Sequence, residues 1–297
     1  MSLLGIDLGT TGIKCAAYDE DGIMLGKTYR EYPLYMPKKG VAELDQSLVT
    51  SSLFENLREL NGFETVLKDP VEALSISVSG DEAMPVDKSG APLYNTIMSM
   101  DIRGYKENEW INEVIGAEEL YRITGQPPSN LYPLNKLIWF KNNKPEIYEK
   151  IYKLLCWEEF IFMKLGSEPV SDYSVTCRTL AFDLIKKQYC LEILRKTGVD
   201  ANLFPKAVLS GTMIGTVDKK LGASLGFKND VKIVTGGFDQ ICAALGSGVV
   251  QQGMASIGTG TMEIMQICFK KPVTDSTMMN YGYPFCNHAL DNLFIIR

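Results

Sequence analysis

Alternating apolar and polar positions at the start of the chain predict three short strands. Residues 3–7 are an apolar run that ends in an acid, and residues 13–18 and 23–29 are two further runs. The intervening segments, Gly-Thr-Thr-Gly at 9–12 and Asp-Glu-Asp-Gly at 19–22, are typical of turns. We therefore expect three successive antiparallel strands at the opening of an α/β domain.

Two more buried strands and a hairpin are expected further along the chain. Residues 71–78 and the β-branched run 231–235 each lead into glycines and an acid, and residues 254–267 read as a hairpin. Apolar spacing predicts helices over residues 47–60, 107–115, 136–141, 157–165, 191–197 (with Gly198 as its C-terminal glycine) and 241–245. The aromatic residues Trp139, Phe140 and Trp157 are expected to pack in the core.

A short internal similarity suggests two related domains. Residues 4–11 and 255–261 both place a Gly/Thr turn after an apolar strand. This pattern fits two domains that each open with a phosphate-facing hairpin. We place the first domain at residues 1–245 and the beginning of the second at residues 246–297.

Composition narrows the classes of function. The 297 residues are 45% hydrophobic and 22% charged, with a net charge of −6, so no basic surface points to nucleic acid as a partner. Neither a membrane span nor a signal peptide is expected from the apolar runs. The seven scattered cysteines favour free thiols in a reducing cytoplasm. With His288 as the single histidine, chemistry based on carboxylates is expected.

The strongest local motif covers residues 7–14, Asp-Leu-Gly-Thr-Thr-Gly-Ile-Lys. Glycines let a polyphosphate approach backbone N–H groups, and threonine hydroxyls add neutral donors. Asp7 could hold Mg²⁺ and Lys14 could offset phosphate charge. A strand rather than a helix follows, so this is no Walker A loop. The alternative is a simple hairpin turn.

A second motif, Gly-Gly-Phe-Asp-Gln at residues 236–240, places Asp239 just past a buried strand, where a helix begins. Ligands of α/β sheets usually lie at such strand ends. A base for phosphoryl transfer from ATP to a hydroxyl must be an acid held rigidly beside a cleft. The alternative is an N-cap aspartate that only stabilises the helix.

Together with Gly-Thr-Gly-Thr at 258–261, these two segments resemble the phosphate and catalytic motifs of the FGGY carbohydrate kinases. That family includes xylulose, ribulose, gluconate and glycerol kinases, and the similarity spans essentially the whole chain. The resemblance implies a ribonuclease H-like (actin-like ATPase) α/β fold. It also implies one complete N-terminal sugar-binding domain and the start of a C-terminal nucleotide-binding domain.

The resemblance further implies ATP and Mg²⁺ as cofactors and a small sugar or polyol as substrate. It makes Asp239 the general base and Asp7 the residue that positions Mg²⁺. The residues that would face the phosphates of ATP or ADP are Gly9, Thr10, Thr11, Lys14, Gly258, Thr259 and Gly260. Those that would meet the sugar, beside Asp239, are Gly80, Asp81, Glu82, Asp101 and Arg103.

The sequence departs from the family pattern in the sugar region. Ser99 stands where many relatives have the tryptophan of W-x-D-x-R, so an aromatic wall of the pocket is expected to be missing. Gly80, Asp81 and Glu82 stand where relatives often have Gln-Met-His or Arg-Glu. For Asp81 and Glu82 a solvated turn is the alternative to a sugar contact. The sequence therefore predicts the type of reaction but not the specific sugar.

Other expectations concern activity and assembly. The chain ends before the family's adenosine-binding glycines, so we expect these 297 residues to bind sugar weakly and to show little kinase activity. A non-catalytic actin-like module for sugar sensing or interaction is the alternative function. Relatives are often dimers or tetramers, so a homodimer is an expectation that no residue pattern here fixes.

A serine hydrolase is a further alternative. Residues 222–226 match G-x-S-x-G, and Asp239 and His288 follow Ser224 in the order of a catalytic triad. However, residues 221–227 do not read as a strand that leads into a helix, which the nucleophile turn of such enzymes requires.

Overall fold

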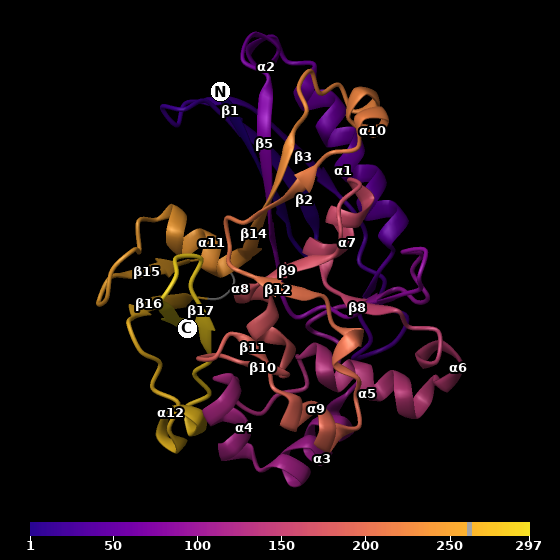
Figure 1. Ribbon diagram of the computed structural model, residues 1–297, viewed down its shortest axis with the longest axis vertical. Coiled ribbons are helices and arrows are strands. Elements are labelled where there is room, and N and C mark those ends of the chain that lie inside the picture. Colours follow the sequence, from indigo (N-terminus) through magenta and orange to yellow (C-terminus); the bar gives the residue numbers. More distant parts are fainter. Residues whose placement is uncertain (260–262) are drawn as a thin grey trace.

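A six-stranded mixed sheet forms the centre of the molecule, whose computed structural model describes residues 1–259 and 263–297. The strand order across the sheet is β13-β14-β5-β1-β2-β3, and β1, β5 and β14 can be followed in Figure 1. The strands are β1 (Ser2–Leu8), β2 (Gly12–Tyr18), β3 (Met24–Glu31), β5 (Val71–Val78), β13 (Met213–Thr216) and β14 (Lys232–Phe238). β1 and β14 run parallel to β5 on its two sides, whereas β2, β3 and β13 are added antiparallel.

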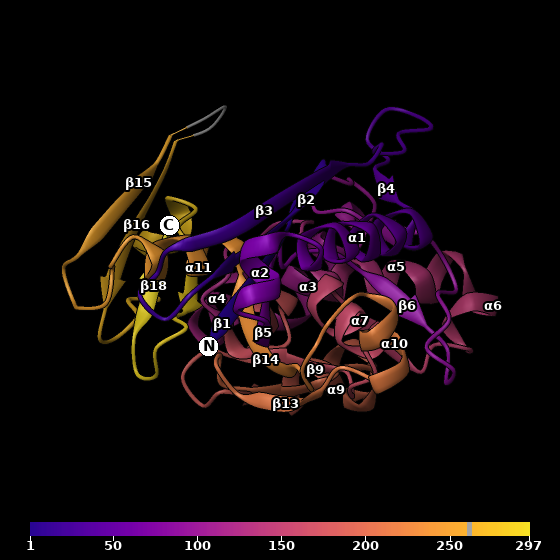
Figure 2. The same ribbon diagram turned by 90° about the horizontal axis from the view of Figure 1, so that it is seen from above.

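The three predicted opening strands are confirmed, and their side-chain pattern explains how they pack. In β1, Leu4, Ile6 and Leu8 are buried while Leu3 and Gly5 are exposed on the other face. Helix α1 (Gln46–Asn61) covers the buried face, and Figure 2 shows it lying along β2 and β3. Its N-cap is Asp45, whose carboxylate accepts the N–H of Ser47 at 2.7 Å.

A separate group of helices lies at the end of the molecule away from the N-terminus (Figure 1) and has its own apolar core. It comprises α3 (Tyr105–Ile115), α4 (Ala117–Thr124), α5 (Pro133–Asn143) and α9 (Leu191–Thr197). Ile111, Leu137 and Phe140 are fully buried there. α9 ends at Gly198, which has φ of 63° and confirms the predicted C-terminal glycine.

A second, antiparallel sheet follows near the C-terminal end of the chain, with the order β15-β16-β18-β17. Its strands are β15 (Ala255–Gly258), β16 (Ile264–Phe269), β17 (Phe285–Asn287) and β18 (Phe294–Ile296). The predicted hairpin is confirmed, but Gly260 and Thr261 lie outside the described residues. Phe285 and Ile295 are fully buried in the main core, so this sheet packs on the first part of the chain. The boundary between residues 245 and 246 stays a prediction.

Shorter elements complete the fold. The remaining helices are α2 (Glu64–Lys68), α6 (Pro145–Tyr148), α7 (Trp157–Lys164), α8 (Tyr173–Thr176), α10 (Lys219–Ser224), α11 (Asp239–Gly246) and α12 (Ser276–Asn280), with 3-10 turns η1 (Cys177–Thr179) and η2 (Ala201–Leu203). The short strands are β4 (Glu43–Leu44), β6 (Met84–Val86), β7 (Thr96–Ile97), β8 (Lys153–Leu155), β9 (Val170–Asp172), β10 (Phe182–Asp183), β11 (Gln188–Tyr189) and β12 (Lys206–Val208). None of the described helices combines the length and apolar character needed to span a bilayer.

The serine hydrolase alternative is wrong. Ser224 is the last residue of α10, and its hydroxyl donates to the carbonyl of Leu221 at 2.7 Å. His288 is buried elsewhere: its Nε2 lies 2.8 Å from the carbonyl of Val249, and its Nδ1 accepts the N–H of Leu290. The serine is therefore part of a helix rather than a nucleophile on a strand-to-helix turn.

Candidate active site

The carboxyl ends of β1 and β14 border a cavity of about 370 Å³. Both strands run parallel to β5, so the residues at these ends reach the same edge of the sheet. The cavity is lined by Asp7, Asp239, Gln240, Ala243, Gly258, Thr259, Ile264 and Gln266. The structure thus brings together the predicted base, the predicted Mg²⁺ residue and two residues of the predicted nucleotide loop.

Asp239 stands at the junction of β14 and α11. The N-cap position belongs to Phe238, and among the described residues the Asp239 carboxylate accepts only the N–H of the adjacent Gln240, at 2.6 Å. The N-cap alternative is therefore wrong, because capping requires a bond to a residue two or three positions further on. Burial raises the pKa of Asp239 to about 6, although the Gln240 N–H and Arg297 oppose the rise. A carboxylate with this pKa can accept a proton near neutral pH.

Asp7 and Lys14 face each other across β1 and β2, with Nζ and Oδ2 3.3 Å apart. Ser77 on β5 points its hydroxyl toward the other carboxylate oxygen of Asp7, at 3.5 Å. The Asp7 side chain is 45% exposed, which leaves it open to a ligand. No cluster of three or more His, Cys, Asp or Glu within residues 1–259 and 263–297 could hold a metal by itself. A single carboxylate suits Mg²⁺, which is commonly held by one or two carboxylates together with substrate phosphates.

The turn between β1 and β2 is anchored by Tyr32. The N–H of Gly9 donates to the carbonyl of Gly12 at 3.0 Å, closing the turn. The Tyr32 hydroxyl donates to the carbonyl of Gly9 at 2.5 Å, and its N–H donates to the carbonyl of Thr11 at 3.2 Å. Thr10 and Thr11 therefore sit at the tip of a fixed turn that follows β1, and their contact with a phosphate stays a prediction.

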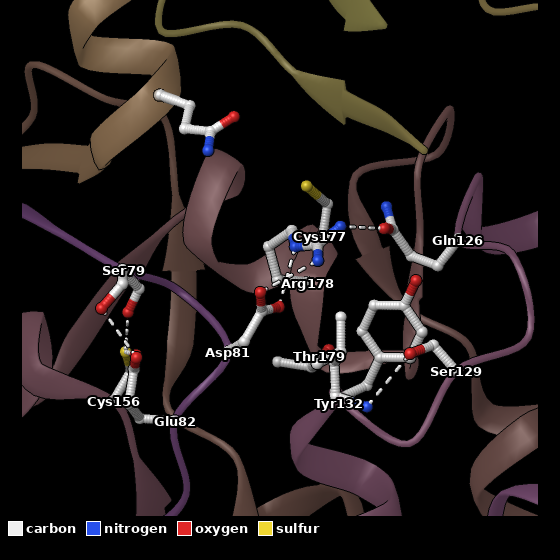
Figure 3. Close-up of polar contacts among 12 residues, drawn as sticks. Ser79, Asp81, Glu82, Gln126, Ser129, Tyr132, Cys156, Cys177, Arg178 and Thr179 are labelled. Atoms are coloured by element: carbon white, nitrogen blue, oxygen red, sulfur yellow. Dashed lines mark hydrogen bonds and ion pairs between the residues drawn. The ribbon is translucent and has the colours of Figure 1, made fainter. Parts of the chain in front are cut away.

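Asp81, in the loop after β5, is paired rather than solvated. Its side chain is 9% exposed, and its carboxylate accepts Nε of Arg178 at 2.9 Å and Nη2 at 3.0 Å (Figure 3). Arg178 also donates to Gln126, and Lys136 donates to the Asp81 carbonyl at 2.5 Å. Burial alone would raise the pKa of Asp81, but the charges of Arg178, Arg297 and Lys136 and the hydrogen bond from Arg178 together outweigh it, so the pKa is lowered. The solvated-turn alternative is wrong for this residue.

Glu82 is fully buried, so the solvated-turn alternative is wrong for it too. Its carboxylate accepts the Ser79 hydroxyl at 2.7 Å and lies 3.3 Å from the thiol of Cys156 (Figure 3). Burial raises the pKa of Glu82 to about 7. These contacts tie the loop to the N-terminal end of α7, and they lie apart from the Asp81–Arg178 pair in Figure 3.

Asp101 and Arg103 bind each other and Glu43 rather than lining the cavity. Asp101 is fully buried and accepts Nη2 of Arg103 at 2.6 Å and the N–H of Ala42 at 2.8 Å. Nη1 of Arg103 lies 2.8 Å from Glu43, and its guanidinium lies over the ring of Trp139, 5.1 Å from the centroid. Aromatic partners of this pair thus come from α5 and from Tyr94, whose hydroxyl accepts Nη1 of Arg103 at 3.2 Å, and not from position 99.

Sequence reasoning missed three side chains near Asp239. The guanidinium of Arg297 lies 4.6 Å from the centre of the Phe238 ring and 4.0 Å from Asp81. Gln266 lines the cavity and donates to the carbonyl of Gln240 at 2.6 Å. The side-chain oxygen of Gln240 is buried and has no hydrogen-bond partner in the described part of the chain. These contacts join segments far apart in the sequence, so no local pattern signals them.

At Gly80, just before Asp81, close packing leaves little room for a side chain. A Cβ atom at Gly80 would lie 3.2 Å from the ring of Phe238 and 3.4 Å from the side chain of Arg178. The missing side chain lets the loop after β5 pack closely against the residue that precedes Asp239. Gly80 therefore supports the site through packing.

Comparison with known families gives a match over most of the chain. Residues 2–246 match the model described as "FGGY family of carbohydrate kinases, N-terminal domain". Among curated proteins, the chain is 26% identical over 259 residues to a xylulose kinase of Staphylococcus xylosus, covering 86% of this chain and 53% of the relative. It is 26% identical over 294 residues to a gluconokinase of Bacillus subtilis, covering 99% of this chain and 56% of the relative. The chain therefore spans about half the length of these relatives.

Solved structures show the same fold. A ligand-bound xylulose kinase from Lactobacillus acidophilus superposes with a TM-score of 0.90 at 23% identity, covering 99% of this chain and 59% of that one. A glycerol kinase from Plasmodium falciparum with ADP superposes with a TM-score of 0.89 at 20% identity, covering 99% of this chain and 60% of that one. These similarities confirm the predicted ribonuclease H-like, actin-like ATPase fold.

Proposed function

The chain belongs to the FGGY family of carbohydrate kinases, and on this premise we propose that its protein transfers a phosphoryl group from ATP to a hydroxyl of a sugar or polyol. One observation carries the proposal: Asp239, with a pKa of about 6, shares a cavity with Asp7, Gly258 and Thr259. A proton acceptor, a ligand for Mg²⁺ and a glycine-containing turn for phosphates are the groups that this transfer needs.

Mg²⁺-ATP, when bound, supplies the phosphoryl group. Asp7 would hold the Mg²⁺, and Lys14 beside it offsets phosphate charge. The turn at Gly9, Thr10 and Thr11 and the segment at Gly258 and Thr259 would face the phosphates from two sides. The donor set fits, since a half-exposed carboxylate, a cation and glycine-rich backbone meet at one edge of the sheet.

On the acceptor side, Asp239 takes the proton of the reacting hydroxyl. Within residues 1–259 and 263–297 its carboxylate makes one hydrogen bond, to the N–H of Gln240, so further lone pairs remain to receive a hydroxyl proton. The buried, unpartnered side-chain oxygen of Gln240 in the same cavity wall is a second acceptor for a hydroxyl. A polyhydroxylated substrate matches a wall of this kind.

Arg297 favours one subset of acceptors, those that carry a carboxylate. Its side chain is 15% exposed, and its Nε has no hydrogen-bond partner among the described residues. Asp81, the nearby anion, is already bound in two places by Arg178. A buried cation whose one anionic partner is 4.0 Å away and shared with Arg178 is stabilised further by an anionic ligand. Among the named substrates of relatives, gluconate carries a carboxylate and xylulose does not.

The test is an ADP-release screen with the complete translation product that contains this chain. The acceptors are pentuloses, hexuloses, polyols and aldonates, and the Asp239→Asn variant is the control. ADP release that depends on one acceptor class and is lost in the variant supports the proposal. Sugar binding without ADP release from any acceptor would instead favour the non-catalytic sensing module, and equal rates in the variant would remove Asp239 from the role of base.

A further inference from the structure

The strand that carries Asp239 into the cavity contains a β-bulge. Val234 pairs with Ser75 of β5 and Gly237 pairs with Ser77, so Thr235 and Gly236 together face the single residue Ile76. A bulge of this kind breaks the ladder of hydrogen bonds locally and redirects the residues that follow. Backbone N–H groups released from the ladder in a buried strand need other acceptors.

Two buried side chains supply these acceptors. Oε1 of Glu158, on α7, accepts the N–H of Gly236 at 2.9 Å. Oγ of Ser174, on α8, accepts the N–H of Phe238 at 2.9 Å. Both Glu158 and Ser174 are fully buried. The last three residues of β14 before Asp239 are therefore held by α7 and α8 as well as by the neighbouring strand β5.

Asp172, at the end of β9, links the two acceptors. Its carboxylate accepts the Ser174 hydroxyl at 2.6 Å and the Ser174 N–H at 2.7 Å. Its own N–H donates to the second oxygen of Glu158 at 3.1 Å. Because the Ser174 hydroxyl proton goes to Asp172, a lone pair of the oxygen faces the N–H of Phe238. Each group in this chain of bonds thus has a defined donor or acceptor role.

The two glycines of the bulge are required by the same packing. A Cβ atom at Gly236 would lie 2.0 Å from the carbonyl oxygen of Ile76, and one at Gly237 would lie 2.7 Å from Oγ of Ser174. Both distances are shorter than any normal contact. The glycines let the strand approach β5 on one side and the Ser174 hydroxyl on the other.

We propose that Glu158 and Ser174, oriented by Asp172, are positioning residues that fix the bulge of β14 and thereby aim the Asp239 carboxylate into the cavity. The proposal rests on the proposed function in so far as Asp239 is the base. Neither Glu158 nor Ser174 lines the cavity, so they act through the backbone of residues 236–238. A displacement of about 1 Å in a reacting group is enough to lower a rate by about 100-fold.

The central test compares Ser174→Ala with Ser210→Ala. Both remove a hydroxyl that donates to the Asp172 carboxylate, at 2.6 Å and 2.8 Å respectively, but only Ser174 also accepts from β14. We expect Ser174→Ala to speed amide hydrogen exchange at Phe238 by at least about tenfold and to lower kcat by about 10- to 100-fold, with the sugar KM within about threefold. Ser210→Ala is expected to leave the exchange rate at Phe238 and kcat within about twofold of the parent values.

A second pair of variants covers the case in which Ser174→Ala unfolds. Glu158→Gln keeps one oxygen to accept the N–H of Gly236 but gives up the acceptor for the N–H of Asp172, whereas Glu158→Leu removes both acceptors. The glutamine variant should keep most of kcat and the leucine variant should lose it. Equal exchange rates and equal kcat for Ser174→Ala and Ser210→Ala, or for the two Glu158 variants, would overturn the inference.

The exchange measurement separates this inference from the proposed function. It uses the folded chain without substrate and reports directly on the N–H groups of residues 236 and 238. If Asp239→Asn keeps kinase activity, the proposed function fails, and with it the reason to call these residues positioning residues, whatever the exchange rates. If Asp239→Asn is inactive but the two serine variants behave alike, only the inference about Ser174 and Glu158 fails.

Discussion

The Asp81 carboxylate and the Arg178 guanidinium form a two-point ion pair across 97 residues of sequence, with distances of 2.9 and 3.0 Å. Arg178 is 1% exposed and its guanidinium also lies over the rings of Tyr132 and Phe238. The pair therefore joins the loop after β5 to the short turn η1. Several expected effects of substitution follow from this geometry and from that of Asp239.

Asp81→Asn should destabilise the chain strongly, because it leaves Arg178 buried without its anion. We expect a loss of about 3–5 kcal/mol in the free energy of unfolding at pH 7. The lowered pKa of Asp81 means that its contribution is present above pH 4 and is lost as the pH falls through the folded-state pKa. Denaturant unfolding at pH 7 measures the loss. Glu119→Gln, which breaks the exposed pair with Arg122, is the control, with a change below about 1 kcal/mol.

Asp239→Asn should stabilise the folded chain at neutral pH while abolishing activity. Burial raises the pKa of Asp239 from 3.8 to about 6, so its ionised form destabilises the folded state by up to about 3 kcal/mol above pH 6. The asparagine variant should gain about 1–3 kcal/mol at pH 7.5 and nothing below about pH 3, where the Asp239 carboxyl is protonated in both the folded and the unfolded state. Thermal or denaturant unfolding at the two pH values checks this. A variant less stable than the parent at pH 7.5 would contradict it.

The pH dependence of kcat/KM should also report the ionisation of Asp239. Because the base must be ionised, kcat/KM is expected to fall tenfold per pH unit below about pH 6, the pKa of Asp239. Glu82, in the loop after β5, has a pKa of about 7 and is the other group that could produce this acid limb. Glu82→Gln should therefore leave the acid limb near pH 6. If the acid limb of kcat/KM moves in this variant, the limb reports Glu82 instead of Asp239.

Gly236→Ala tests the bulge directly. Its Cβ would meet the Ile76 carbonyl at 2.0 Å, and we expect a loss of about 3 kcal/mol or more in stability. Gly246→Ala, at the end of α11, meets no atom within 4 Å and should be neutral or stabilising by up to about 1 kcal/mol. Unfolding curves of the two variants give the comparison. Similar stabilities would show that the strand relaxes around the added methyl group.

The sequence predicted the elements whose signals are local. The turn at Gly9 to Gly12 and the alternation in β1 placed the opening strands correctly, and Val71–Val78 matches β5 residue for residue. The strand expected at 231–235 instead continues to Phe238 as β14. Gly236 and Gly237 look like strand breakers in sequence. In the fold the strand continues past them: Gly237 pairs with Ser77 of β5, and Gly236, in the bulge, donates its N–H to Glu158 on α7.

The candidate site was predicted only in part, for the same physical reason. Asp7 and Asp239 were found because each follows an apolar strand, and parallel strands deliver their ends to one edge. Asp101 and Arg103 were expected at the sugar, but their charges are taken up by each other and by Glu43. The partners Arg178 and Glu158 come from helices that share no local pattern with the residues they bind, so sequence order alone could not connect them.

The position of β14 between β13 and β5 also has a consequence for biosynthesis. The strands β1, β2, β3 and β5 lie within residues 2–78, but their sheet gains its next member only when residues 232–238 have been synthesised. Until then the nascent chain carries β5 as an open edge of apolar residues, a surface prone to pair with other chains. The strand that closes this edge is the one that delivers Asp239. Closing this edge of the sheet and delivering Asp239 to its place are therefore a single event, which precedes synthesis of Gly258, Thr259, Ile264 and Gln266, the residues that complete the cavity wall.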